Sequence, residues 1–158
     1  MATTSDWSAT ALCTYTDVTA RYARVDDLTD PTSGQTAQQQ VEAYAAKAKD
    51  HIGRLLDVVL RERREEITLA DLADLKDAIG DLTVFKEGCV AWTLKLLFED
   101  NSIREDDYND KKMRDFQTEF KREYQIALQL MTLDIDQSAD ISDAEALAGP
   151  AGNRFMRV

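Results

Sequence analysis

The chain has few of the residues on which metal sites and covalent catalysis most often depend. Among 158 residues there are two cysteines, Cys13 and Cys89, and one histidine, His51. Two cysteines this far apart make no disulfide framework, and we expect two reduced, buried thiols. One histidine gives no basis for a His-based zinc site or a Ser–His–Asp triad. The chain also has no Gly-rich phosphate loop, Cys-x-x-Cys pair, nucleophile elbow or HExxH motif. We therefore expect that the protein is not an enzyme, and that it has no catalytic residue, cofactor or metal ligand.

Long apolar runs are absent as well. The unbroken apolar stretches fall far short of the ~20 residues that a bilayer-spanning helix needs. The opening residues, MATTSDWSATALCTY, have neither a basic start nor an apolar run, so we expect no signal peptide. Residues 1–14 are rich in Ser, Thr and Ala, and we expect a loosely held terminus there.

Positive charge is also in short supply. The 19 Lys and Arg residues face 30 Asp and Glu residues, and the net charge is −11. Lys and Arg that neutralise phosphates supply most of a protein's affinity for nucleic acid, so this balance argues against an electropositive DNA-binding face. An acidic surface suits a channel that DNA must pass without sticking. It equally suits a domain that is merely soluble.

The most apolar segment spans residues 82–98. Apolar side chains recur there at alternating steps of three and four, which is typical of an α-helix. A second stripe lies beside the first, which predicts a central helix with neighbours on more than one side. The rhythm extends back through Ile79, so we expect one helix from Leu69 to Glu99, with a kink or close contact at Gly80. The two stripes are Leu82, Phe85, Cys89, Trp92 and Leu96, and Val90, Leu94, Leu97 and Phe98.

A short helix is expected near the start of the chain. Thr14 or Thr16 serves as its N-cap. Val18 and Tyr22 are four residues apart and face the core together. The turn-rich segment 26–34 then ends the helix.

Two long amphipathic helices complete the prediction. The first begins after Thr36 and runs into the charged segment 61–66, with His51 at the edge of its apolar face as a core-edge histidine. The second follows a Ser102-x-x-Glu105 capping box and ends near Leu133. The expected fold class is therefore all-α, a small helical bundle of one short and three long helices over residues 1–133.

Residues 134–158 differ in character from this body. They are acidic, then interrupted by Gly and Pro, and we expect an extended C-terminal arm. Within the arm, segment 134–145 places oxygen ligands at the spacing of a calcium-binding loop. Ala139 stands where that loop needs Gly, and Gly149-Pro150 cuts the exiting helix short, so a solvated acidic linker is the alternative. The pattern reads Asp134-x-Asp136-x-Ser138-x-Asp140-x-Ser142-x-x-Glu145.

Taken in order, these features resemble the head–tail connector (adaptor or head-completion) proteins of tailed bacteriophages. The segment YTDVTARY, residues 15–22, stands where that family has an opening Tyr-x-Thr-x-x-Asp-Leu motif, although it lacks a clear Asp-Leu pair. The Ala-rich helix AYAAKAKDHIGRLLDVVL and the central helix LTVFKEGCVAWTLKLLF follow in the family's order. The chain closes on Arg154-Phe155-Met156-Arg157, similar to the family's terminal Arg-x-Phe-x-Arg signature.

The resemblance implies a structural virion protein of the neck, assembled in the host cytoplasm. Such proteins form a ring, typically dodecameric, beneath the portal protein and present a platform to the tail or stopper protein. DNA passes through the ring without specific binding, and no membrane is involved. The C-terminal arm docks on the portal or on a neighbouring subunit.

The last residues of the arm have the chemistry for such docking. Arg154 and Arg157 can form charge-assisted bonds to acidic groups, and Phe155 and Met156 are apolar anchors. These four residues are the candidate partner-binding site. Two other functions are left open by the sequence: a calcium-responsive interaction module built on 134–145, and an acidic DNA-mimic or regulatory helical protein.

Overall fold

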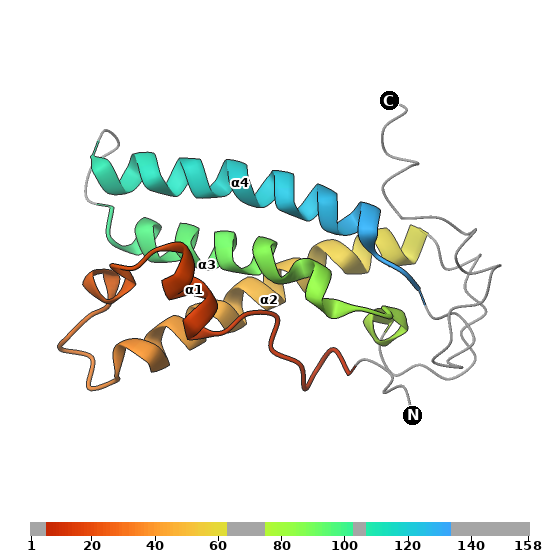
Figure 1. Ribbon diagram of the computed structural model, residues 1–158, viewed down its shortest axis with the longest axis horizontal. Helices are drawn as coiled ribbons and strands as arrows, with labels where there is room; N and C mark the ends of the chain where they lie inside the picture. Colours follow the sequence, from red (N-terminus) through yellow and green to blue (C-terminus); the bar gives the residue numbers. More distant parts are fainter. Residues whose placement is uncertain (1–5, 63–74, 103–106, 134–158) are drawn as a thin grey trace. The chain divides into compact units, whose positions relative to one another are not determined.

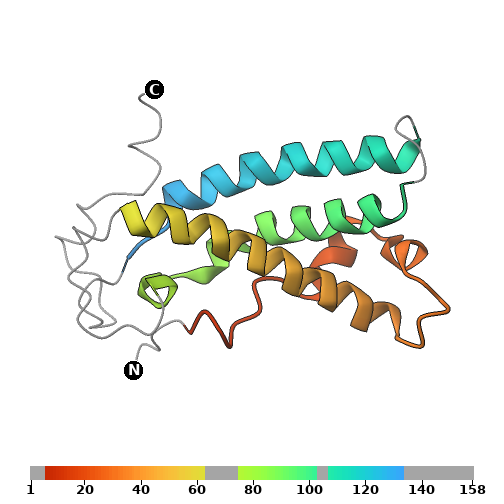
Figure 2. The ribbon, with the colours of Figure 1, turned by 180° about the vertical axis from the view of Figure 1, so that it is seen from behind.

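The computed structural model describes residues 6–62, 75–102 and 107–133. Its helices are α1 (Tyr15–Arg21), α2 (Ala37–Glu62), α3 (Lys86–Asp100) and α4 (Tyr108–Leu130). Short 3-10 turns lie at Val25–Leu28, Leu75–Ala78 and Leu82–Phe85. Figure 1 labels the four helices, and Figure 2 shows them from behind. The predicted all-α fold with one short and three long helices is confirmed.

The chain divides into two compact units. Unit 1 consists of Met1–Thr10, Ile52–Val84 and Gln125–Val158, and unit 2 of Ala11–His51 and Phe85–Tyr124. Helices α2 and α4 contribute residues to both units. The predicted division into a body over 1–133 and an arm from 134 stays a prediction, because residues after 133 lie outside the described part.

Unit 2 is built around α3. The helix is buried on nearly every side, as its two apolar stripes predict. Phe98 is fully buried, and its ring lies 5.2 Å from that of Tyr22 and 5.7 Å from that of Phe116. Helix α4 packs against α3 at Gly88, where a Cβ would make an ordinary van der Waals contact with the Phe120 ring at 3.9 Å. The buried residues of α3 are Gly88, Cys89, Val90, Ala91, Thr93, Leu94, Lys95, Leu97 and Phe98.

Two helices of unit 2, α1 and α2, begin where the sequence places their caps. Thr14 and Asp17 form a capping box at the start of α1. At the start of α2, the Thr36 hydroxyl accepts from the Gln39 N–H at 3.2 Å, and the Gln39 side chain accepts from the Thr36 N–H at 3.0 Å. The Ser102–Glu105 box lies partly outside the described residues. At the start of α4 it is Asp107 that accepts from the backbone N–H of Asp110, at 2.6 Å.

The predicted uninterrupted helix from Leu69 to Glu99 is wrong over its described part. Between two 3-10 turns, Ile79 forms an antiparallel bridge with Leu133, and the Gly80 N–H donates to the Thr132 carbonyl at 3.0 Å. A backbone group bonded to another segment cannot complete an α-helical turn, and glycine is a weak helix former. The chain is therefore non-helical at Gly80, and α3 begins only at Lys86.

The prediction of a loosely held terminus is also wrong for the described residues 6–14. In unit 1, the Trp7 side chain is 7% exposed, and its backbone N–H donates to Asp77 at 2.9 Å. Gly53 makes room for its ring, because a Cβ at that position would lie 3.2 Å from Trp7 Cζ2. In unit 2, Leu12 and Cys13 are buried.

Candidate interaction surface

The residues predicted to bind a partner lie outside the described part of the chain. This applies to Arg154, Phe155, Met156 and Arg157, and to the calcium-loop pattern at 134–145. The candidate surface is therefore built from the described residues of each unit.

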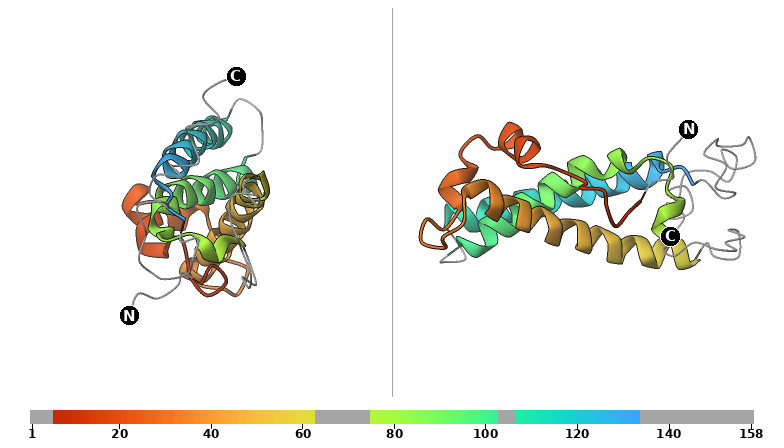
Figure 3. Two further views of the ribbon diagram at one scale, coloured as in Figure 1. Left: turned by 90° about the vertical axis from the view of Figure 1, so that its right-hand side faces the viewer. Right: turned by 90° about the horizontal axis from the view of Figure 1, so that it is seen from below.

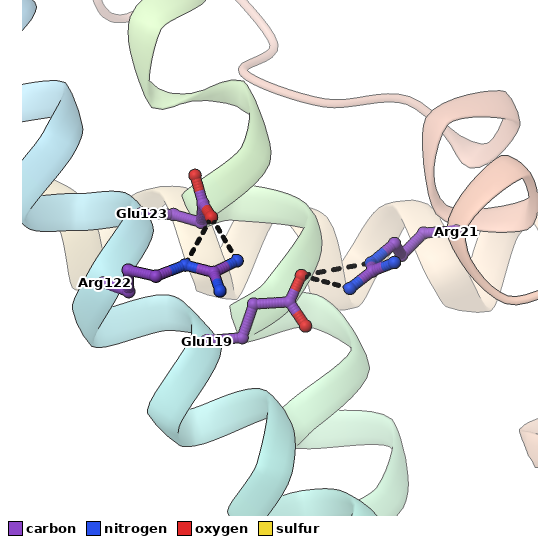
Figure 4. Close-up of polar contacts among 4 residues, drawn as sticks. All are labelled: Arg21, Glu119, Arg122 and Glu123. Carbon is purple, nitrogen blue, oxygen red and sulfur yellow. Dashed lines mark hydrogen bonds and ion pairs between the residues drawn. The ribbon is translucent and has the colours of Figure 1, made fainter.

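An exposed ion pair joins α1 to α4 in unit 2. Arg21 donates from Nε and Nη2 to Glu119 Oε1, at 3.0 and 2.6 Å (Figure 4). One turn further on, Arg122 donates in the same manner to Glu123, which raises the pKa of the Arg122 guanidinium. Each of these two guanidinium groups is paired with a carboxylate, so both positive charges are neutralised. Arg21 and Glu119 are 98 residues apart, and no spacing rule in the sequence could have paired them.

A second ion pair joins α1 to α3. Lys86 Nζ lies 2.5 Å from Asp17 Oδ1. Lys86, and next the Thr14 hydroxyl, hold the pKa of the Asp17 carboxyl below its ordinary value. Asp17 therefore acts both as the partner of a cation and as part of the helix cap.

The C-terminal end of α3 is held by polar side chains. Tyr44 donates from its hydroxyl to Asp100, and this bond, together with burial, raises the Tyr44 pKa to about 12. The Asn101 amide donates to the Leu28 carbonyl at 2.9 Å, and Asn109 donates to the Asn101 carbonyl at 2.7 Å. These bonds fasten the end of α3 to α2, to the turn after α1 and to α4.

His51 is stacked on an aromatic cluster of unit 2. Its ring lies parallel to that of Trp92, with centroids 3.9 Å apart, and Phe120 lies 4.6 Å from Trp92. Lys95 Nζ lies 4.9 Å from the Trp92 ring and pairs with Glu99. His51 is half-buried, as predicted for a histidine at the edge of the core.

The two thiols meet inside unit 2. Cys13 and Cys89 are both buried, which confirms that part of the prediction, and both are free. Their sulfurs lie 2.9 Å apart. The sequence offered no sign of this pairing, because the two residues are 76 positions apart.

Some large apolar side chains of the described residues face solvent. In unit 1 these are Val58 at 59%, Ile126 at 42% and Leu130 at 60% exposed. In unit 2, Tyr108 is 60% exposed. Ile126 and Leu130 are four residues apart on α4, so they share one side of the helix. Single exposed apolar side chains are ordinary, so this pair alone does not mark an interface.

The described residues hold no group of three or more His, Cys, Asp and Glu side chains suited to a metal ion. None of the helices in the described ranges is long and apolar enough to cross a bilayer. Comparison with protein-family models, with curated proteins and with solved structures gave no match.

Proposed function

We propose that the protein is a structural head–tail connector of a tailed bacteriophage, a subunit of a ring that joins the portal to the tail. The observation that supports this most is the order of the elements. A short capped helix at Tyr15–Arg21 precedes a long Ala-rich helix, then a central apolar helix, then a long amphipathic helix. The motifs that resemble the connector family occur along the sequence in this same order.

The body of such a subunit must keep its shape while it is loaded from both sides. In unit 2, the buried helix α3 forms a closely packed core, and ion pairs on its surface link α1 to α3 and to α4. The side chains that pair across the helices, Arg21 with Glu119 and Asp17 with Lys86, fix α1 against its neighbours. A purely structural role is consistent with this build.

The acidic balance of the chain fits a channel for DNA. The net charge is −11, and Arg21 and Arg122 each have a carboxylate partner. Duplex DNA binds where Lys and Arg release its counterions, so a surface of this type has little affinity for it. In the proposed ring the protein surrounds DNA and does not bind it specifically.

The docking element of the proposal is the C-terminal sequence Arg154-Phe155-Met156-Arg157. We expect the double substitution Arg154→Ala with Arg157→Ala to lower binding to portal-bearing heads at least tenfold, because two charge-assisted bonds are lost. The helical circular dichroism spectrum and the Tm should not change. The measurement is co-sedimentation of the purified protein with heads that carry the portal encoded beside its gene.

A matched control separates docking from general charge. The double substitution Lys121→Ala with Arg122→Ala also removes two positive charges, but from exposed positions of α4. This variant should bind heads as the unchanged protein does. Equal loss of binding in both variants, or full binding without residues 153–158, would count against docking by the arm. Absence of any binding by the unchanged protein would count against the connector proposal itself.

Calcium binding by segment 134–145 is tested in the same preparation. Titration calorimetry with calcium should give no heat of binding if the segment is an acidic linker. Saturable heat, lost in an Asp134→Asn with Glu145→Gln variant, would favour the calcium-responsive module instead.

A further inference from the structure

The two cysteines of the chain are brought together in the interior of unit 2. Cys13 comes from the segment just before α1, and Cys89 from the first turn of α3. Their Sγ atoms lie 2.9 Å apart, whereas a disulfide bond is about 2.05 Å long. An approach of about 0.9 Å would therefore bring the sulfurs to bonding distance.

The surroundings hold the pair in place. Lys86 and Asp17, whose ion pair joins α3 to α1, lie three and four residues from Cys89 and Cys13 respectively. Cys13 Sγ is 3.8 Å from the Thr93 hydroxyl, and Cys89 Sγ is 3.8 Å from the Ala45 carbonyl. Cys13 itself precedes the helix cap, so its backbone is not committed to helical hydrogen bonds and can make the small movement.

The two thiols are not equivalent. The hydrogen bond between the two thiols lowers the Cys13 pKa, although burial opposes this. The same interaction and burial raise the Cys89 pKa. Cys13 is also the less deeply buried of the two, at 5% against 0% exposed. Thiolates are the nucleophiles in thiol oxidation, so we assign Cys13 as the residue that reacts first and Cys89 as the residue that resolves.

We propose that Cys13 and Cys89 form a modification site, at which a peroxide converts the two thiols into an intrachain disulfide. The Cys13 thiolate attacks one oxygen of hydrogen peroxide, the O–O bond breaks, and the products are Cys13 sulfenic acid and water. The Cys89 sulfur then attacks the Cys13 sulfur and expels the hydroxyl as a second water. Two thiols and one peroxide thus give one disulfide and two waters: the sulfurs are oxidised and the peroxide oxygens are reduced.

The bond would fasten the segment before α1 to α3. It closes a loop between residues 76 positions apart, and long loops give the largest restriction of the unfolded chain. We expect the oxidised protein to unfold at a Tm about 5–15 °C above that of the reduced protein. The proposal is independent of the connector function, because it depends only on the interior of unit 2.

In the test, the native protein of residues 1–158 is treated with hydrogen peroxide at low protein concentration. Intact mass spectrometry should show the loss of two hydrogen masses, and peptide mapping should show the peptides of Cys13 and Cys89 joined. Dithiothreitol should reverse both changes. In glutathione redox buffers, the equilibrium constant for the disulfide should be at least about tenfold larger in the native protein than in concentrated urea, because only the fold holds the sulfurs together.

Two single variants identify the roles. Cys89→Ala should accumulate a sulfenic acid on Cys13 that dimedone traps, and Cys13→Ser should give no dimedone adduct at Cys89. The wild-type measurements stand even if a variant fails to fold. Recovery of both thiols unchanged, a disulfide only between chains, an equal equilibrium constant in urea, or a Tm that does not rise would each overturn the proposal.

Discussion

The two units of the chain are stabilised by different means. Unit 2 has an interior of aromatic rings around a buried helix, with Phe98 fully buried and the half-buried Trp92 near the edge. Figure 3 shows two further views of the helices that supply these rings. Unit 1 has an aliphatic interior, in which Ile52, Leu56 and Leu60 are fully buried. Directed contacts add to it: Trp7 against Gly53, Lys76 on Asp57 at 2.6 Å, and the bridge between Ile79 and Leu133.

This difference decides what kind of change each unit tolerates. An interior of packed rings loses stability in proportion to the volume removed. The directed contacts of unit 1 add a few positions at which one added atom or one lost partner lowers the stability. The substitutions below test this contrast.

The largest effect is expected for Phe98→Ala in unit 2. The side chain is 0% exposed and contacts Tyr22 and Phe116, so the substitution removes packed volume at the centre. We expect a loss of about 3–5 kcal/mol in the free energy of unfolding, measured by urea denaturation. Val58→Ala, at a position that is 59% exposed, is the control and should change stability by less than about 0.5 kcal/mol. A loss at Phe98 no greater than at Val58 would contradict the account of unit 2.

The next effect is expected for Gly53→Val in unit 1. Even a Cβ at this position meets Trp7 Cζ2 at 3.2 Å, so a branched side chain must displace the ring, with a loss of about 1–3 kcal/mol. In a Trp7→Ala background the same substitution should be neutral within about 0.5 kcal/mol, because the obstacle is gone. Ala43→Val, on an exposed part of the same helix, is the control. Equal effects of Gly53→Val with and without Trp7 would show that the position of the Trp7 ring does not depend on the absence of a side chain at Gly53.

A smaller effect is expected for Asp17→Asn, which weakens the α1 cap and the pair with Lys86. The loss at neutral pH should be about 1 kcal/mol. The folded-state pKa of Asp17 lies below its ordinary value, so its contribution is present above about pH 4 and is lost as the pH falls through the folded-state pKa. The difference between variant and parent should therefore shrink on acidification, as followed by thermal unfolding at several pH values.

Glu119→Gln is the matched control for Asp17. It breaks the ion pair with Arg21 but no helix cap (Figure 4), and it should cost less than about 0.5 kcal/mol. A loss as large as that of Asp17→Asn would mean that the capping bonds contribute nothing measurable.

The only gain is expected for Tyr124→Phe. The Tyr124 hydroxyl is buried, and the described structure gives it no hydrogen-bond partner. Burial also raises the Tyr124 pKa. Removing the hydroxyl should stabilise the protein by about 0.5–1 kcal/mol, which a Tm shift would detect. A loss of that size would instead reveal a partner for this oxygen.

The helices could be predicted because their signals are local. The stripes around Phe98 and the caps at Thr14 and Thr36 each lie within a few residues of the structure they determine. Glycine at position 80 predicts a kink or a close contact there. The full break could not be predicted, because it depends on a bridge to a distant segment that leaves no periodic mark in the sequence. The expectation of one helix through Ile79 followed a rhythm that two 3-10 turns also satisfy.

The contacts of the candidate surface are non-local in the same way. Arg21 with Glu119 and Cys13 with Cys89 are each formed by residues more than seventy positions apart. Trp7 was expected in a loose terminus because no sequence pattern shows that Gly53 would make room for it. The predicted docking residues Arg154–Arg157 rest on sequence chemistry alone and stay a prediction.

The pairing of Ile79 with Leu133 has a mechanical consequence. The backbone of residues 132–133 is bonded to residues 79–80, so a pull on the chain beyond Leu133 is first borne by those two backbone contacts. Tension from that direction would be taken up by the segment that leads into α3 before it could unwind the last turn of α4.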